Sequence, residues 1–127
     1  MPSVTYNIKI THPTTKLEKE FATVIADTLF RLPAKVKQKV IRKVSFALEK
    51  RGSPAIIMGY PNSNEPTIFL NYVSLMEKSD SYKMRTVAHE IAHFILKHLS
   101  GKGSKLVKER EKEVNDLCDK WGFGKNR

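Results

Sequence analysis

The pattern His89-Glu90-x-x-His93 lies within a segment, residues 87–96, that is otherwise apolar. On an α-helix the two histidines stand about one turn apart on the same face, so both imidazoles can reach one metal ion. At ~100° per residue, an apolar stripe covers the opposite side of this helix and consists of Val87, Ala88, Ile91, Ile95 and Leu99. We therefore expect a buried helix that holds both histidines on its less crowded side.

The residue between the histidines gives the motif its chemistry. H-E-x-x-H on a helix is the signature of zinc proteases, in which the glutamate is a base and not a ligand. Zn²⁺ would lower the pKa of a bound water to roughly 7, Glu90 would accept its proton, and the ion would polarise a scissile carbonyl. The simpler alternative is a pair of core histidines without metal. The i, i+4 spacing with Glu90 beside His89 favours the metal site.

A catalytic zinc needs a third protein ligand and an open position for water. No histidine follows His98, which comes five residues after His93, so the ligand is sought among carboxylates. Residues 105–121 are predicted to form the last helix, with an apolar stripe of Val107, Val114, Leu117, Cys118 and Trp121. Glu111 falls inside this stripe, and a buried carboxylate is costly without a cation or metal. Glu111 is thus the predicted third ligand; the alternative is an acidic residue at the border of a solvated face.

His89-Glu90-x-x-His93 followed by Glu111-Lys-Glu-Val-Asn115 resembles the gluzincin arrangement, and within it the ImmA/IrrE-type metallopeptidases. Their metal helix has the form R-x-T-x-A-H-E-x-x-H and a later helix carries E-x-E-A-N; this chain has Arg85-Thr-Val-Ala-His89-Glu90 and has Val114 in place of the alanine. The resemblance covers roughly residues 56–121. It implies that His89, His93 and Glu111 bind zinc, that Glu90 is the catalytic base and that Asn115 supports the ligands from outside their shell. The F-A-x-x-L-L-x-P segment common after that helix in the family is absent.

Composition describes one ordinary globular domain, residues 1–127, with 40% hydrophobic and 28% charged residues. There is no apolar run long enough for a membrane span and no signal-peptide core, so a cytoplasmic protein is expected. The single Cys118 cannot form an internal disulfide and is expected to be a small buried hydrophobe. The net charge of +10 favours contact with nucleic acid, anionic membrane surfaces or acidic proteins.

The remaining segments predict an α+β fold with a small, mostly antiparallel sheet packed on helices. A strand is expected at 3–10, a helix at about 15–31 that begins with a Thr15/Glu18 capping box, and a second helix from Pro33 to near Gly52. Strands at 55–58 and 67–73 are joined by a short turn-rich connection and should pair antiparallel. Ser79-Asp-Ser81 offers an N-cap for the metal helix. Strand 67–73 is, by the resemblance, the strand that an extended substrate would pair with; the alternative is an internal strand without a free edge.

The second helix is strongly basic, since residues 31–51 contain eight Lys or Arg and one Glu. Its expected basic face holds Lys35, Lys39, Arg42, Lys43 and Lys50, with Phe46 as an exposed aromatic. Such a face in the helix at 33–51 could contact the phosphates of a nucleic acid, although a solvated face is the plainer interpretation.

Three functions are compatible with these features. The first is a minimal zinc metalloendopeptidase acting on a protein or peptide substrate, with Tyr60, Tyr72, Tyr82 and His98 as unranked candidates for stabilising the oxyanion. The second is a zinc-containing regulatory or binding module with little turnover, which would have no use for the general base Glu90. The third is a nucleic-acid-associated protease, similar in logic to SprT-like enzymes, although those supply a third histidine.

Overall fold

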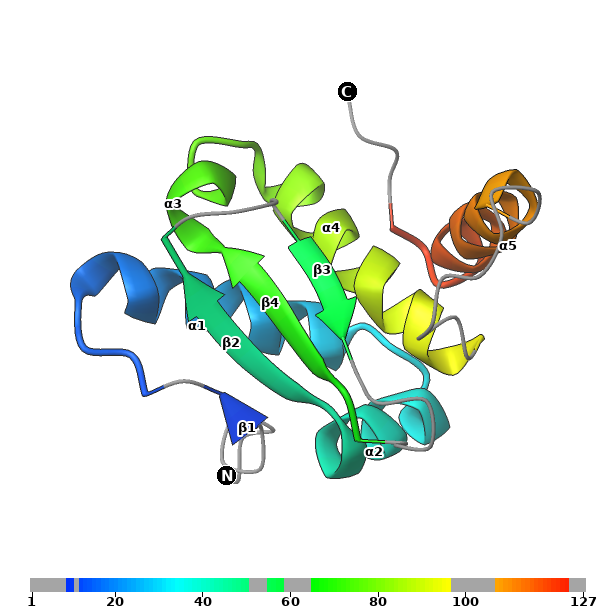
Figure 1. Ribbon diagram of the computed structural model, residues 1–127, viewed down its shortest axis with the longest axis horizontal. Helices are drawn as coiled ribbons and strands as arrows, with labels where there is room; N and C mark the ends of the chain where they lie inside the picture. Colours follow the sequence, from blue (N-terminus) through cyan, green and yellow to red (C-terminus); the bar gives the residue numbers. More distant parts are fainter. Residues whose placement is uncertain (1–8, 11, 51–54, 59–64, 97–106, 124–127) are drawn as a thin grey trace.

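The computed structural model describes residues 9–10, 12–50, 55–58, 65–96 and 107–123 (Figure 1). The strands are β1 (Lys9–Ile10), β2 (Ser45–Glu49), β3 (Ala55–Met58) and β4 (Thr67–Asn71). The helices are α1 (Lys16–Phe30), α2 (Ala34–Lys43), α3 (Tyr72–Leu75), α4 (Asp80–Ile95) and α5 (Val107–Lys120). Residues 3–8 of the first predicted strand lie outside the described residues.

The four strands form one sheet in the order β1-β2-β4-β3. β1 pairs parallel with β2, β2 pairs parallel with β4, and only β3 pairs antiparallel with β4. The expectation of a mostly antiparallel sheet is therefore wrong, although the antiparallel pairing of 55–58 with 67–71 is confirmed. β1 and β2 are parallel because their connection runs through two helices, and a crossover of that length returns a strand in the same direction. β2 and β4 are parallel because β3, which runs antiparallel to β4, comes between them in the chain.

The predicted second helix is too long. α2 ends at Lys43, Val44 follows as its C-cap, and Ser45–Glu49 form β2, in which Phe46 and Leu48 are buried while Ser45 and Ala47 are partly exposed. This alternation has the period of a half-buried strand. Phe46 is 2% exposed, so it is a core residue and not the exposed aromatic of a basic helix face.

β4 lies between β2 and β3, so both of its edges are paired. The expectation that strand 67–73 offers a free edge to substrate is wrong, and its last two residues belong to α3. Among the described strands, the edges of the sheet are β1 and β3. β3 lies alongside α4, which makes it the edge strand next to the metal helix (Figure 1).

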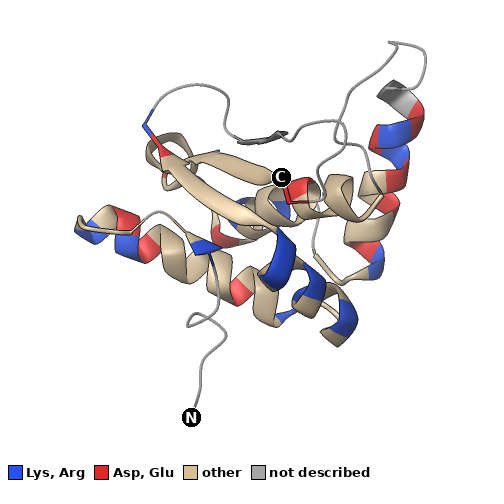
Figure 2. Ribbon diagram, turned by 60° about the horizontal axis from the view of Figure 1, so that its bottom comes forward, with Lys and Arg blue, Asp and Glu red and all other residues tan. Residues whose placement is uncertain are grey.

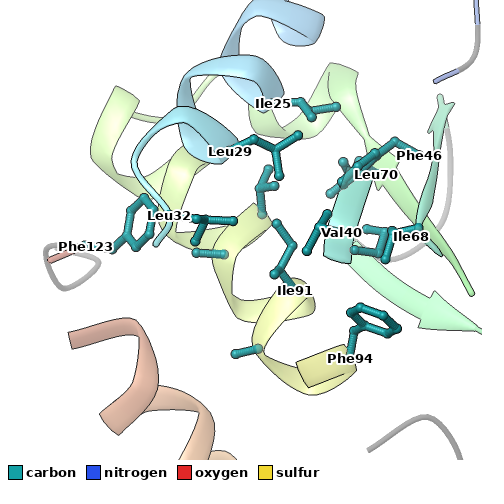
Figure 3. Packing of buried hydrophobic residues seen from close by; sticks show 14 of the residues in the cluster. Ile25, Leu29, Leu32, Val40, Phe46, Ile68, Leu70, Ile91, Phe94 and Phe123 are labelled. Carbon is teal, nitrogen blue, oxygen red and sulfur yellow. The ribbon is translucent and has the colours of Figure 1, made fainter. Parts of the chain in front are cut away.

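The core fills the space between the sheet and the helices α1 and α4 (Figure 3). Ile25 and Leu29 reach into it from α1, Ile91 from α4, and Ile68 and Leu70 from β4. Each of these side chains is fully buried, and burying one stabilises the fold by about 1.5–3 kcal/mol relative to leaving it in water. The side of α4 that carries Ile91 is thereby fixed toward the core, and α5 packs on another side of α4.

Local signals at two helix starts are confirmed. Thr15 and Glu18 form the capping box of α1, and Ser79 caps α4 by accepting a hydrogen bond from the backbone N–H of Tyr82. Thr15 Oγ1 accepts from Glu18 N at 3.1 Å and Glu18 Oε1 accepts from Thr15 N at 2.9 Å. In the described part of the chain no helix is long and apolar enough to cross a membrane.

Candidate metal centre

The two histidines of the motif lie on α4 on a side that faces α5. Val87, Ala88 and Ile91 are fully buried on the core side, while the His89 and His93 side chains keep 26% and 15% of their surface exposed. Their ring centroids are 4.9 Å apart. The predicted helix, with both imidazoles on its less crowded side, is therefore the arrangement observed.

Glu111 reaches both histidines from α5. Its Oε1 lies 2.9 Å from Nε2 of His89 and its Oε2 lies 3.1 Å from Nε2 of His93. The donor atoms of the three residues all lie within 4.8 Å of one another, and no other His, Cys, Asp or Glu joins this cluster among the described residues. Two helices that are separated in the chain by the segment 97–106 thus bring together the three predicted ligands.

Glu111 is less exposed than the neighbouring acidic residues of α5. Val114 and Cys118 are fully buried, Glu111 has a side chain 44% exposed, and Glu109 and Glu113 are exposed. Glu111 lies at the border of the buried side of α5 rather than deep inside it. Its carboxylate is therefore open both to the histidines and to water.

The cluster fits the size and chemistry of a zinc site. In a tetrahedral site with bonds of roughly 2.0–2.1 Å, neighbouring donor atoms stand about 3.4 Å apart. The separations of 2.9 and 3.1 Å from the two Glu111 oxygens to the two Nε2 atoms are a few tenths of an ångström below this value, and all three donors lie within 4.8 Å of one another. Two imidazoles and one carboxylate are a donor set that zinc accepts, and three ligands leave a fourth position open.

Glu90 follows His89 and lies on the inner side of the cluster. Its side chain is 10% exposed, and its Oε2 lies 3.2 Å from Nδ1 of His89. A proton on Nδ1 leaves Nε2 of that ring free to bind a metal. Burial lowers the pKa of His89, but the hydrogen bond to Glu90 and the charges of Glu90 and Glu111 outweigh it and raise the pKa above 6.5.

Arg85 belongs to the site, although its position in the motif before His89 did not by itself predict a role for it. It is 6% exposed and lies one turn before His89 on α4. Its Nη1 donates to Oδ1 of Asp119 and to the backbone oxygen of Phe123, both at 2.9 Å. Its Nη2 donates to Oδ1 of Asn115 at 3.3 Å. The arginine thereby joins α4 to α5 and to the turn that follows it.

The contact of Asn115 shows how it could support the ligands. Asn115 and Asp119 are one turn apart on α5, and both accept from Arg85. Asn115 is one turn after Glu111, so its contact holds the part of α5 that presents the carboxylate. The signal available in the sequence was an arginine one turn before His89, which requires oxygen partners when it is buried.

Of the residues that the structure describes, neither the predicted candidates for stabilising the oxyanion nor Cys118 belong to the three-residue cluster. Tyr72 is 3% exposed in α3, and Tyr82 is in the first turn of α4, about two turns from His89. Tyr60 and His98 lie outside the described residues. Cys118 is fully buried, as expected, and burial raises its pKa to about 11, so the thiol stays protonated.

Comparisons of the chain with models of protein families, with curated proteins and with solved structures found no significant match. The resemblance to ImmA/IrrE-type metallopeptidases stays a prediction from the motifs.

Proposed function

We propose that the protein is a zinc-dependent metallopeptidase of the gluzincin type that hydrolyses peptide bonds in a protein or peptide substrate. The observation that carries the proposal is the convergence of His89, His93 and Glu111 within 4.8 Å, beside the carboxylate of Glu90. A cytoplasmic site of action is part of the proposal, because the one cysteine is a buried free thiol, as is usual in reducing compartments.

The residues of the site would have three roles, namely metal ligand, general base and support of α5. Nε2 of His89, Nε2 of His93 and the carboxylate of Glu111 would hold the ion, which when bound supplies a Lewis acid and an acidic water. Glu90, whose Oε2 lies 3.2 Å from Nδ1 of His89, is not part of the donor cluster, and it would accept a proton from water and return it to the leaving amine. Arg85 would keep the Glu111 helix in place through Asp119 and Asn115.

The sheet edge beside α4 suggests where an extended substrate would lie. β4 is internal, so the strand available for pairing among those described is β3, which lies along α4. A peptide added to an exposed edge gains main-chain hydrogen bonds that do not depend on its sequence. Substrate recognition through the β3 edge would then be broad, and side-chain selectivity would come from elsewhere in the cleft.

A zinc-containing binding module with little turnover is the competing proposal. Such a module could keep the three ligands and the β3 edge, and in it Glu90 would only orient His89 by accepting from its Nδ1. The 10% exposure of Glu90 costs desolvation of its charge, which a catalytic role would explain. The two proposals therefore differ in what Glu90 does.

The deciding experiment is a peptide-library hydrolysis screen with zinc-loaded wild type and the Glu90→Gln variant. Gln cannot accept the proton, so we expect cleavage by the wild type and a fall of about 10²-fold or more in the variant, with zinc content unchanged. Glu109→Gln, an exposed change on α5, is the matched control and should retain full activity. Zinc binding without any hydrolysis by the wild type would favour the binding module.

A further inference from the structure

The longest stretch of unbalanced charge in the described chain lies on and before α2. Between Thr28 and Leu48 the sequence contains no Asp or Glu and six cations. We call these cations and one aromatic the basic surface, which consists of Phe30, Arg31, Lys35, Lys37, Lys39, Arg42 and Lys43. Figure 2 shows Lys and Arg along α2 with no acidic residue between them, whereas α1 and α5 carry both signs.

Arg42 and Lys43 complement the dipole at the end of α2, but the other charges of α2 do not serve the stability of the helix itself. Lys35 and Lys39, and Lys39 and Lys43, are like charges one turn apart, which repel each other. The first turn has no acidic residue and no side-chain cap, so Lys35 stands at the positive end of the helix dipole. Among the described residues no ion pair joins a cation of α2 to a carboxylate. A polyanion would relieve this repulsion.

Phe30 adds an exposed aromatic ring to the basic surface. It ends α1 and is 69% exposed, the most exposed large hydrophobic side chain among the described residues. Nζ of Lys37 lies 5.0 Å from the centre of its ring, so the aromatic ring contacts one cation of the basic surface. An exposed ring next to a row of cations can stack on a nucleobase while the cations bind the neighbouring phosphates.

Lys39 places this surface near the proposed metallopeptidase site. Its Nζ lies 5.5 Å from the ring of Phe94, the residue after His93 on α4. Three residues after Lys39, the backbone oxygen of Arg42 accepts from Nζ of Lys9 at 2.7 Å, and Lys9 itself lies 4.0 Å from Oε1 of Glu65. The basic surface thus extends from the end of α1 along α2, beside the C-terminal part of α4.

From these observations we infer that the basic surface binds single-stranded nucleic acid, with Phe30 as a base-stacking platform and the cations of α2 as phosphate contacts. The charge pattern selects a polyanion, and the exposed ring selects one with accessible bases over a duplex or a lipid surface. The inference is independent of the metal centre, because none of these residues is a proposed ligand.

The test uses fluorescence anisotropy with the full chain and labelled oligothymidine, oligouridine and a duplex of the same length. We expect the single strands to bind more tightly than the duplex, with log K falling against log salt at a slope of about −3 to −4 if five cations each meet a phosphate. Oligothymidine against oligouridine separates DNA from RNA. No binding to either strand at low salt, or tighter binding to anionic lipid vesicles, would overturn the inference.

Two variants separate charge from stacking. Replacing Lys35, Lys39 and Arg42 by Glu should weaken binding ~100-fold or more at low salt. Phe30→Ala leaves the charge unchanged and should weaken single-strand binding roughly 5- to 150-fold, the range expected for loss of one stacked base. If Phe30→Ala binds like wild type, the surface is a general polyanion site and the assignment to single strands is wrong.

A matched triple variant controls for net charge. Lys16, Lys19 and Lys120 are exposed on α1 and α5, away from the basic surface. Replacing them by Glu also lowers the net charge from +10 to +4, because each of three exchanges removes two positive charges. This control variant should bind single strands nearly as tightly as the wild type. An equal loss of affinity in the two triple variants would overturn the inference. Zinc content should be the same in all variants, which also shows that they fold.

Discussion

Arg85 and Asp119 join the two halves of the candidate metal centre, with Nη1 of the arginine 2.9 Å from Oδ1 of the aspartate. The arginine precedes His89 by one turn on α4, and the aspartate follows Glu111 by two turns on α5. The contact therefore fixes the helix that carries the third ligand against the helix that carries the first two. Because the arginine is 6% exposed, loss of its partner would leave a charge largely excluded from water.

Asp119→Asn should weaken zinc binding without removing a ligand. The variant loses the charge-assisted hydrogen bond to Arg85, so α5 is held less firmly and the affinity for zinc should fall by about 10- to 100-fold. Titration with a competing chelator measures this. Asp116→Asn, which affects an exposed pair with Lys112 on the same helix, is the control and should bind zinc as wild type. Equal affinity in both variants would show that the clamp does not position Glu111.

Removing Glu111 should remove most of the bound metal. Glu111→Ala leaves two imidazoles and no third donor, because no other acidic side chain joins the cluster among the described residues. Elemental analysis after purification under one zinc supply should give about one ion per chain for the wild type and much less for the variant. Glu113→Ala, an exposed change two residues away, should retain the ion. A full complement of zinc in Glu111→Ala would rule it out as a ligand.

Protons and zinc should compete for Nε2 of His89, with opposite effects on stability. The pKa of His89 is raised above 6.5, so in chelator-treated protein its contacts with Glu90 and Glu111 stabilise the fold below pH 6.5 and are lost as pH rises through the raised pKa. Zinc requires the unprotonated nitrogen, so the increase in Tm on adding zinc should grow with pH. Thermal unfolding with and without zinc from acid to neutral pH measures both trends. His89→Asn should abolish the zinc-dependent trend.

Phe46 and Phe30 should respond very differently to truncation. Phe46 is 2% exposed in β2, so Phe46→Ala removes core packing and should lower the free energy of unfolding by about 3–5 kcal/mol. Phe30 is 69% exposed, and Phe30→Ala should change it by no more than about 0.5 kcal/mol. Urea denaturation of both variants measures the difference. Similar values for the two would contradict the placement of residues 45–49 in the sheet.

Features that depend on nearby residues could be predicted from the sequence. The side of α4 that carries His89 and His93 follows from the helical period, and the starts of α1 and α4 follow from Thr15, Glu18 and Ser79, whose hydrogen bonds span only three residues. The choice of Glu111 rested on the period of α5 and on the cost of a buried carboxylate, although its side chain is 44% exposed and lies at the border of the buried side. These are local properties, so no knowledge of the tertiary structure was required.

The strand order and the partners of Arg85 were decided by the tertiary structure. Residues 44–48 alternate in a way that fits a strand, yet they also continue the apolar pattern of α2, and only pairing with β1 and β4 selects the strand. The same pairing makes β4 internal, places the free edge at β3 and buries Phe46. Such choices depend on residues far apart in the chain, since a strand is stable only with partners and the buried Arg85 only with the oxygens of α5.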